Sequence, residues 1–525
     1  MDTLKNHKSG KIPGTCCPCS GDNNLLSRGI TRRKFIQVTG NTTLSIVALS
    51  GLSWQALAAV KTEDQQGIRR DSLVVKPVLV YSSPERRDQQ SWRAWGGIQT
   101  EQDAKEEVAR IGNELKKLQS LSDFPVQFLP ISRVRGPDEL DDIRDLASAD
   151  LFLVYAAGGW MDTFDRLHKT GRDMIFFCRH KSGPVYLWYE IISPRYLRQH
   201  TDKPAITGVN DDDVVIDSQD ELLWRLRALC GLKNTINTTI LAVGGPGAWA
   251  QPEGVVPKLT EEKFKFNIIT VSYEELGGLI REARADNVTA DRTRELAEKY
   301  LQSTGTSLET ERVFVDNGFI LDEIFRKIMD KANCRAITIN GCMGTIMPLA
   351  ETSACLTLSL LNDAGYLAFC ESDFVVIPAG ILLANISGKP VFLNDPTYPH
   401  DGIITLAHCT APRRMDGRKT EPARILTHFE SDYGAAPKVE MALGQTVTNI
   451  IPDFAMNRYT GLVGKIVDNP FMDICRSQID IGFNTDNKII AGNMPGFHWM
   501  TCYGDYNREI GYALRRIGIQ WECFT

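Results

Sequence analysis

The sequence predicts an α/β protein in which two doubly wound parallel-sheet domains precede a C-terminal domain of α/β and β structure. Apolar runs of strand length alternate with helical patterns from residue 71 onward, as expected for parallel sheets covered by helices. The alternation restarts near residue 232, and from residue 357 the chain becomes richer in Pro, Gly, Tyr and Trp. We therefore expect domains at 71–231, 232–356 and 357–525.

The first domain opens with a strand-like run, and an amphipathic helix follows it. Apolar residues of this helix recur at helical spacing: Ala104, Val108, Ile111, Leu115 and Leu118. The predicted elements, in order, are a strand at 72–83, a helix at 101–121, a strand at 126–134, a helix at 139–148, a strand at 149–159 and a helix at 218–231.

The second domain continues the alternation through the apolar segments 237–249, 266–283 and 336–344. The sequence GGPG at 244–247 lies within the first of these segments, directly after its apolar strand-like part, where a phosphate-binding loop can occur. Pro246 and the absence of GxGxxG spacing favour a tight turn between a strand and a helix.

Residues 1–59 have the features of a secretory signal, and a polar linker follows at 60–70. The segment TRRKFIQ (31–37) precedes a mildly apolar stretch that is too short to span a membrane, and small residues offer a cleavage site near Ala59. The adjacent arginines resemble a twin-arginine export motif. We therefore expect the twin-arginine translocation machinery to export the folded chain to the periplasm or another extracytoplasmic compartment. The alternative is an ordinary amphipathic N-terminal segment.

The composition is that of a soluble globular protein, with 43% hydrophobic and 24% charged residues. A formal charge of −6 gives no indication of nucleic-acid binding. Of the 13 cysteines, Cys16, Cys17 and Cys19 lie in the leader, and most of the others stand inside apolar runs. We expect these others to be buried free thiols, because a long chain that folds in a reducing compartment has little use for a disulfide framework.

Two carboxylates, Glu371 and Asp395, end two apolar runs that a helical pattern separates. We predict a βαβ unit in which each strand ends at one carboxylate and the helix, 373–388, begins at an Asp373 cap. Parallel neighbouring strands would bring both carboxylates to the same edge of one sheet, where ligands bind in α/β proteins.

Two neighbouring carboxylates repel each other, and a divalent cation between them removes the repulsion. Such an oxygen-rich site suits Mg²⁺ or Mn²⁺, and an imidazole ligand favours Mn²⁺. Four of the eight histidines lie in the third domain: His400, His408, His428 and His498. His400 and His428 would either lie behind the metal ligands and support them or have a purely structural role. A metal-free interpretation also stays open, in which Glu371 caps a helix and Asp395 begins a turn.

This region resembles the catalytic region of the L-fucose isomerase and L-arabinose isomerase family. The resemblance is carried by CESD at 370–373, NDPTYPHDGIITLAHC at 394–409 and MPGFHWM at 494–500. Motifs carry the resemblance in the C-terminal domain. In the rest of the chain only the predicted architecture, two α/β domains before the catalytic one, matches the family. The metal ligands that the resemblance implies are Glu371, Asp395 and His498, as in the fucose type, with His408 as the additional histidine of the arabinose type.

The resemblance implies a metal-dependent aldose–ketose isomerase in which Glu371 and Asp395 also move the proton between C1 and C2 of a sugar, through an enediolate. The implied cofactor is Mn²⁺ or another divalent cation. Trp499 and Tyr398 are the aromatics expected to face the sugar, and burial in the core is the alternative for both. A homo-oligomer is also implied, in which the N-terminal domain of a neighbour closes the site.

Two other functions compete with this one. An exported protein could keep the isomerase fold and its metal and bind a carbohydrate without turnover, and the export signal favours this reading. An exported sugar oxidoreductase is the third candidate, but the chain has no convincing dinucleotide fingerprint.

Overall fold

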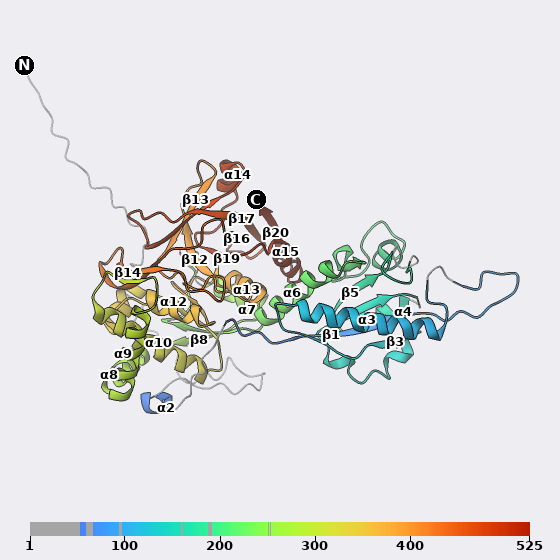
Figure 1. Ribbon diagram of the computed structural model, residues 1–525, viewed down its shortest axis with the longest axis horizontal. Coiled ribbons are helices and arrows are strands. Elements are labelled where there is room, and N and C mark those ends of the chain that lie inside the picture. Colours follow the sequence, from blue (N-terminus) through green and yellow to red (C-terminus); the bar gives the residue numbers. More distant parts are fainter. Residues whose placement is uncertain are drawn as a thin grey trace, which may run out of the picture.

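The computed structural model describes residues 53–58, 67–93, 97–158, 161–186, 192–249, 251–252 and 254–525. The protein is mixed α/β, with two parallel sheets and a larger, mainly antiparallel sheet (Figure 1), and the predicted fold class is confirmed at this level. The export motif at 31–37 lies outside the described residues.

The first sheet has the order β2-β1-β4-β5-β6, with β3 also paired to β1, and all neighbours run parallel. Its strands are β1 (Leu73–Val80), β2 (Val126–Phe128), β3 (Ser132–Val134), β4 (Leu151–Ala156), β5 (Asp173–Cys178) and β6 (Val214–Ile216). Helix α3 (Glu101–Leu121) packs on this sheet and begins at a capping box of Thr100 and Asp103. Its buried face contains Glu107, whereas Val108, predicted to be buried, is only half-buried.

The prediction of a helix at 139–148 is wrong. Two short 3₁₀ turns, Pro137–Leu140 and Leu146–Ser148, lie at the two ends of this segment. Asp has low helix propensity, and Asp141 and Asp145 form ion pairs with basic residues of neighbouring elements. The segment therefore makes ionic contacts where the pattern predicted an apolar helix face. Two further α-helices among the described residues of this part are α4 (Met161–His168) and α6 (Gln219–Thr235).

The second sheet has the order β11-β10-β7-β8 and is also entirely parallel. Its strands are β7 (Thr239–Val243), β8 (Asn267–Val271), β10 (Ala336–Ile339) and β11 (Leu367–Phe369). The helices of this part are α7 (Val256–Lys263), α8 (Tyr273–Ala285), α9 (Asn287–Leu301), α10 (Arg312–Lys331), α11 (Met347–Ala350) and α12 (Cys355–Asp363). The expected boundary after residue 231 lies close to the end of α6, and the one after residue 356 falls inside α12.

The third sheet follows the path β16-β19-β12-β13-β18-β17-β20, and an additional pairing of β16 with β17 closes six of its strands into a ring. Its strands are β12 (Phe392–Pro396), β13 (Ile403–His408), β16 (Thr446–Pro452), β17 (Arg458–Asp468), β18 (Ser477–Gly482), β19 (Trp499–Tyr503) and β20 (Gln520–Phe524). A small sheet joins β9 (Thr306–Leu308), β14 (Ala423–His428) and β15 (Tyr433–Val439). The helices here are α13 (Ile377–Ser387), α14 (Asn487–Gly492) and α15 (Asn507–Arg516).

The predicted parallel pairing of the two strands around α13 is wrong. β11 is the edge strand of the second parallel sheet, whereas β12 lies between β13 and β19 and runs antiparallel to both. All eleven residues of α13 are buried, and a helix that is hydrophobic on every side is surrounded by protein. α13 therefore connects two sheets and does not return the chain to the first one.

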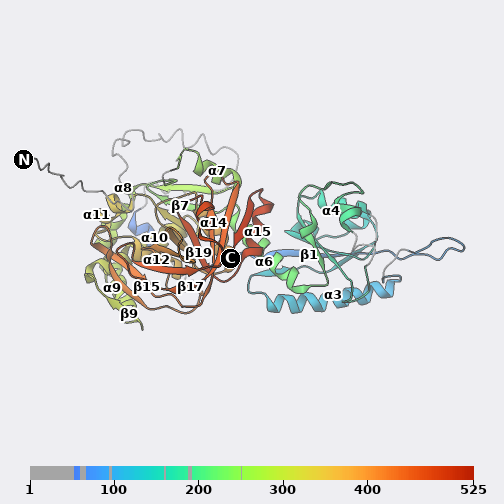
Figure 2. The same ribbon diagram turned by 90° about the horizontal axis from the view of Figure 1, so that it is seen from above.

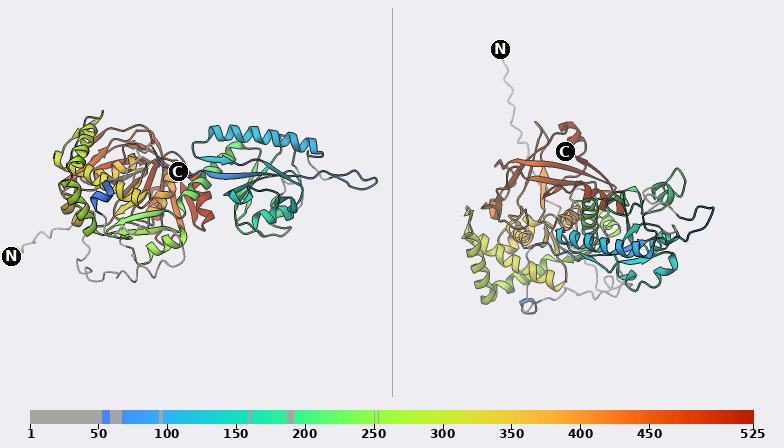
Figure 3. Two further views of the ribbon diagram at one scale, coloured as in Figure 1. Left: turned by 90° about the horizontal axis from the view of Figure 1, so that it is seen from below. Right: turned by 45° about the vertical axis from the view of Figure 1, so that its right-hand side comes forward.

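The first sheet and its helices form a lobe that stands apart from the rest of the molecule (Figure 2). Helix α6 leads out of this lobe and lies close to α13 and α15 (Figures 1 and 3). Polar contacts tie the junction, because Arg227 pairs with Glu509 at 2.8 Å and the Tyr512 hydroxyl donates to Asp213 at 2.6 Å. The metal-binding candidates lie in the other, larger part of the molecule.

The short helix α2 (Trp54–Ala58) lies within the range predicted to be removed on export. Trp54 and Leu57 are buried in the apolar core shared by the second sheet and its helices. The Trp54 amide donates to Glu282 on α8 at 2.5 Å, and Lys327 on α10 donates to the Ala58 carbonyl at 3.2 Å. A cut near residue 59 would separate this docked helix from the rest of the chain.

Seven of the ten cysteines after the leader are buried, so the expected burial holds for most of them. Within the described ranges no single helix is long and apolar enough to cross a membrane. One helix pair bent by 86°, Cys342–Ala350 with Cys355–Asp363, meets the length and composition criteria together.

Candidate metal centre

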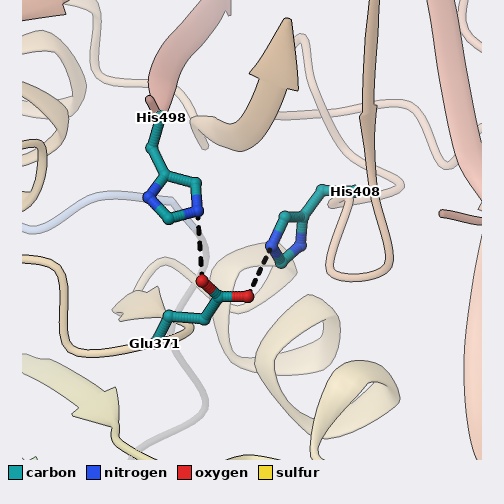
Figure 4. Close-up of side chains that lie close together, drawn as sticks. All are labelled: Glu371, His408 and His498. Carbon is teal, nitrogen blue, oxygen red and sulfur yellow. Dashed lines mark ion pairs between the residues drawn. The ribbon is translucent and has the colours of Figure 1, made fainter. Parts of the chain in front are cut away.

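Three of the four residues predicted as metal ligands form one group, and the fourth, Asp395, contacts it through His498. Ligand atoms of Glu371, His408 and His498 all lie within 4.8 Å of one another, and both imidazoles face the carboxylate (Figure 4). The His498 Nε2 atom is 3.1 Å from Glu371 Oε2 and 3.2 Å from Asp395 Oδ1. The His408 Nε2 atom is 3.8 Å from Glu371 Oε1. Glu371 and the two imidazoles thus form the group, and Asp395 lies beside it on His498.

Strand register brings three of these residues together. Asp395 is paired with Ala407, the neighbour of His408, and Asn394 is paired with Trp499, the neighbour of His498. The central strand β12 therefore places its carboxylate beside a histidine from each flanking strand. The fourth residue, Glu371, comes from the other direction, in the turn that follows β11 of the parallel sheet.

The turn that carries Glu371 has an unusual backbone. Glu371 has φ of 64° and Ser372 has φ of 46°, a left-handed region that costs a residue with a side chain about 1–2 kcal/mol. Hydrogen bonds support the turn, since the Ser372 amide donates to Thr338 Oγ1 at 3.1 Å and the Gly247 amide donates to the Ser372 carbonyl at 3.0 Å. Such strained conformations cluster at functional sites.

The donor atoms fit a cation. Glu371 Oε2, Asp395 Oδ1 and His498 Nε2 are buried and have no hydrogen-bond partner of acceptable geometry. Buried polar atoms are almost always hydrogen-bonded, so three orphaned atoms at one point call for an explanation. An ion that accepts all of them as ligands supplies one, and two carboxylate oxygens with imidazole nitrogen suit Mn²⁺ better than Mg²⁺.

Exposure differs between the two kinds of ligand. The side chains of His498 and His408 are 0% and 5% exposed, whereas those of Glu371 and Asp395 are 13% and 21% exposed. The imidazoles thus form the inner side of the cluster, and the carboxylates lie on the side that solvent reaches. A small molecule would meet the carboxylates first.

The carboxylates and imidazoles of the cluster stabilise each other's charged forms. Burial disfavours the ionised carboxyl of Glu371, but the facing imidazoles of His408 and His498 hold its pKa far below the usual range. Burial also disfavours a charged His498, yet the neighbouring carboxylates of Asp373 and Asp395 raise the pKa of this imidazole well above its usual value. A cation bound here would compete with protons for the imidazole nitrogens.

Each imidazole also has a partner at its other nitrogen. The His408 Nδ1 atom is 3.0 Å from Thr410 Oγ1, and the His498 Nδ1 atom is 2.7 Å from Asp373 Oδ2. The prediction that Asp373 caps a helix is wrong. Helix α13 begins at Ile377 with no side-chain cap, because residues 371–376 form turns. Sequence reasoning gave Asp373 no role at the site, since its partner is 125 residues away.

The other predicted site residues lie elsewhere. Trp499 is fully buried in the core around the antiparallel ring, which matches the core alternative. Tyr398 is 71% exposed. His400 is exposed beside Asp401, and the Nδ1 atom of His428 lies 3.1 Å from Ser431 Oγ.

Two aromatic residues that the sequence analysis did not select pack against the cluster. Trp249 and Phe497 are stacked with ring centroids 4.8 Å apart, and both meet the His498 ring edge-on, at 5.3 and 4.9 Å. Trp249 follows β7, and the next described helix, α7, begins only at Val256, so the expected tight turn from strand to helix at 244–247 is wrong. Part of the Phe497 surface is exposed, so this pair forms an apolar wall beside the candidate ligands.

Models of known protein families give no match to this chain, and a search of curated proteins finds no relative. The residues and geometry described above are therefore the grounds on which a function is proposed.

Proposed function

We propose that the protein is a metal-dependent aldose–ketose isomerase of the kind found in the L-fucose and L-arabinose isomerase family. The observation that carries this proposal is the convergence of Glu371 Oε2, Asp395 Oδ1 and His498 Nε2, three buried atoms without hydrogen-bond partners. A cluster of two carboxylates and two imidazoles, partly open to solvent on its carboxylate side, suits chelation of two neighbouring sugar oxygens.

In this proposal Glu371, Asp395 and His498 hold the cation, and His408 completes the set. A bound Mn²⁺ supplies Lewis acidity that polarises a sugar carbonyl and stabilises enediolate charge, an effect worth several kcal/mol. The imidazoles, being buried, hold the site in place. The carboxylates, being partly exposed, are the groups that can reach a substrate.

Isomerisation transfers a proton from C2 of the aldose to C1 and moves the carbonyl from C1 to C2. One carboxylate of the cluster takes the C2 proton and returns it at C1. The hydroxyl proton of O2 passes to O1 by way of the other carboxylate, so no other reactant is needed. Asp395 and Glu371 are the two groups that face the open side of the cluster. Positioned acid–base groups of this kind contribute about 10²–10⁴-fold to the rate.

The stacked Trp249 and Phe497 rings favour a second candidate function. An exposed aromatic surface beside a metal centre suits the apolar face of a sugar whether or not the sugar is then converted. A carbohydrate-binding protein that retains the isomerase fold without turnover would use the same cluster and the same wall. Turnover is thus the property that separates the two functions.

The first experiment measures metal binding and turnover in one preparation. Protein stripped by a chelator is expected to take up one Mn²⁺ per chain and to melt at a higher temperature with it. A hundredfold excess of ligand over its Kd stabilises the native state by about 2.7 kcal/mol. Ketose formation is then followed with a panel of aldoses. Absence of Mn²⁺ binding together with an unchanged melting temperature contradicts the metal centre, and Mn²⁺ and sugar binding without conversion supports the second function.

We also propose that the twin-arginine machinery exports the chain to an extracytoplasmic compartment. The grounds are the adjacent residues Arg32 and Arg33 before a weakly apolar stretch. Replacing both with Lys is expected to retain the full-length chain in the cytoplasm, as followed by cell fractionation and immunoblotting. Arg28→Lys, which leaves the motif intact, is the matched control. Export of the double variant at the parent level contradicts this proposal.

A further inference from the structure

The imidazole of His498 lies between two carboxylates that are two residues apart in the chain. Its Nδ1 atom is 2.7 Å from Asp373 Oδ2, and its Nε2 atom is 3.1 Å from Glu371 Oε2. Both Asp373 and His498 are buried. A neutral imidazole carries one proton, so a hydrogen bond donated from Nδ1 to a carboxylate leaves a lone pair on Nε2 that points into the cluster.

Asp373 is itself held from two sides. Its Oδ1 atom accepts the Val375 amide at 3.0 Å, which leaves Oδ2 for His498. Its backbone forms a parallel bridge with Gly247, where the Phe374 amide donates to the Gly247 carbonyl at 3.1 Å. The acceptor for His498 is therefore part of a hydrogen-bonded frame at the end of β7, in the parallel sheet.

The left-handed backbone of Glu371 and Ser372 explains how one short turn reaches both ring nitrogens. Side chains two residues apart on an extended strand point the same way. Here two consecutive left-handed residues curl the chain, so that Glu371 approaches Nε2 while Asp373 approaches Nδ1. His498 precedes a strand of the antiparallel ring, so this contact also ties the two sheets together at the centre.

We propose that Asp373 is a positioning residue that fixes the tautomer and the ring orientation of His498 and thereby sets the affinity of the metal centre. This inference rests on the proposed metal function. Carboxylates that hydrogen-bond metal-ligating histidines commonly contribute 10–100-fold to metal affinity. Asp373 does not face the cation or the sugar, and it acts through His498.

Mn²⁺ affinity tests the proposal directly. Asp373→Ala removes the acceptor and is expected to weaken Mn²⁺ binding about 10–100-fold, measured as free Mn²⁺ by electron paramagnetic resonance. Asp373→Asn keeps an oxygen that can accept the bond but loses the charge, and a smaller loss is expected. Asp322→Asn is the matched control, because Asp322 is also buried and paired, in its case with Arg326 at 2.7 Å on α10. It is expected to retain the parent affinity.

A second measurement does not require metal. Nitrogen NMR of the histidine rings at alkaline pH, where the imidazole is neutral, is expected to find the His498 proton on Nδ1 in the parent and to lose that preference in Asp373→Ala. The signal is assigned by its absence in His498→Gln. A parent that binds no Mn²⁺ but holds the proton on Nδ1 refutes the proposed function and leaves Asp373 as the group that orients the ring.

Two outcomes overturn the inference. One is a proton on Nε2 in the parent, and the other is unchanged Mn²⁺ affinity in Asp373→Ala. If that variant does not fold, Asp373→Asn provides both measurements, because it is nearly isosteric with the parent residue. Equal affinity and an equal tautomer in the parent and Asp373→Asn then show that the charge of Asp373 does not position the ring.

Discussion

Glu371→Gln and Asp395→Asn are each expected to reduce isomerisation by at least about 100-fold, by the magnitude typical of general acid–base catalysis. Each change is nearly isosteric and affects a side chain that is partly exposed at the cluster, so the fold should persist. Each removes a negative charge beside two imidazoles, and with it a cation ligand and a base. The two losses concern one unit, so the double variant should be little worse than either single one.

Asp401→Asn is the control for this pair. Asp401 lies six positions after Asp395, its side chain is 94% exposed, and its φ of 50° is one that Asn tolerates well. Ketose formation is measured at saturating Mn²⁺, and circular dichroism monitors the fold. Parent-level activity in both Glu371→Gln and Asp395→Asn would mean that the cluster is not the catalytic centre.

The sequence selected two carboxylates that the structure places beside the same histidine, but the geometry predicted for them is wrong. Both were expected at the ends of neighbouring parallel strands, but β11 and β12 belong to different sheets. They meet because the turn at Glu371 projects from the parallel sheet toward β12 of the antiparallel ring. Local pattern identifies a strand and its end, whereas the choice of pairing partner depends on contacts between residues far apart in the chain.

Asp373 shows the limit of local rules more clearly. An Asp before an apolar helical pattern is a good cap, and nothing within ten residues argues against that reading. The structure begins the helix at Ile377 and gives the carboxylate to His498. His498 could be selected only through a resemblance of motifs, because no periodicity connects residues so distant.

The two parallel sheets were the best-predicted part of the fold, since alternation of strands and helices is a local signal. The antiparallel ring was not predicted, because its closure depends on pairings between strands far apart in the chain, which no local pattern specifies. The prediction of which α3 residues face the core was wrong at one position. It assigned Val108 to the core, where the structure buries Glu107.

Glu107 makes this error informative, because a buried charge on a predicted apolar face needs partners. Glu107, Arg179 and Tyr186 are all fully buried. The Arg179 guanidinium forms an ion pair with Glu107 Oε1, and the Tyr186 hydroxyl donates to the same oxygen at 2.5 Å. Arg179 also pairs with Glu114 at 2.9 Å, and Glu114 is partly exposed. This network joins α3 to the segment that follows β5.

Glu107→Leu is expected to lower the free energy of unfolding by about 3–5 kcal/mol, the cost typical of breaking a buried ion pair from one side. Leucine is close to glutamate in volume, so packing should change little. The loss of stability is expected because the buried Nε of Arg179 and the hydroxyl of Tyr186 lose their acceptor. The triple variant Glu107→Leu, Arg179→Met, Tyr186→Phe should regain most of the stability, because apolar replacement of a whole buried network is often neutral.

The same substitution one residue earlier is the matched control. Glu106 is exposed on α3, and Glu106→Leu should change the free energy of unfolding by no more than about 0.5 kcal/mol. Urea unfolding of the full chain gives the stability, and hydrogen exchange of the β4 and β5 amides locates the change in the N-terminal lobe. Equal stability of Glu107→Leu and Glu106→Leu would show that the network adds nothing beyond packing. If the triple variant is no more stable than Glu107→Leu, the loss of stability comes from removing Glu107 itself. Leaving Arg179 and Tyr186 without their acceptor would then contribute nothing.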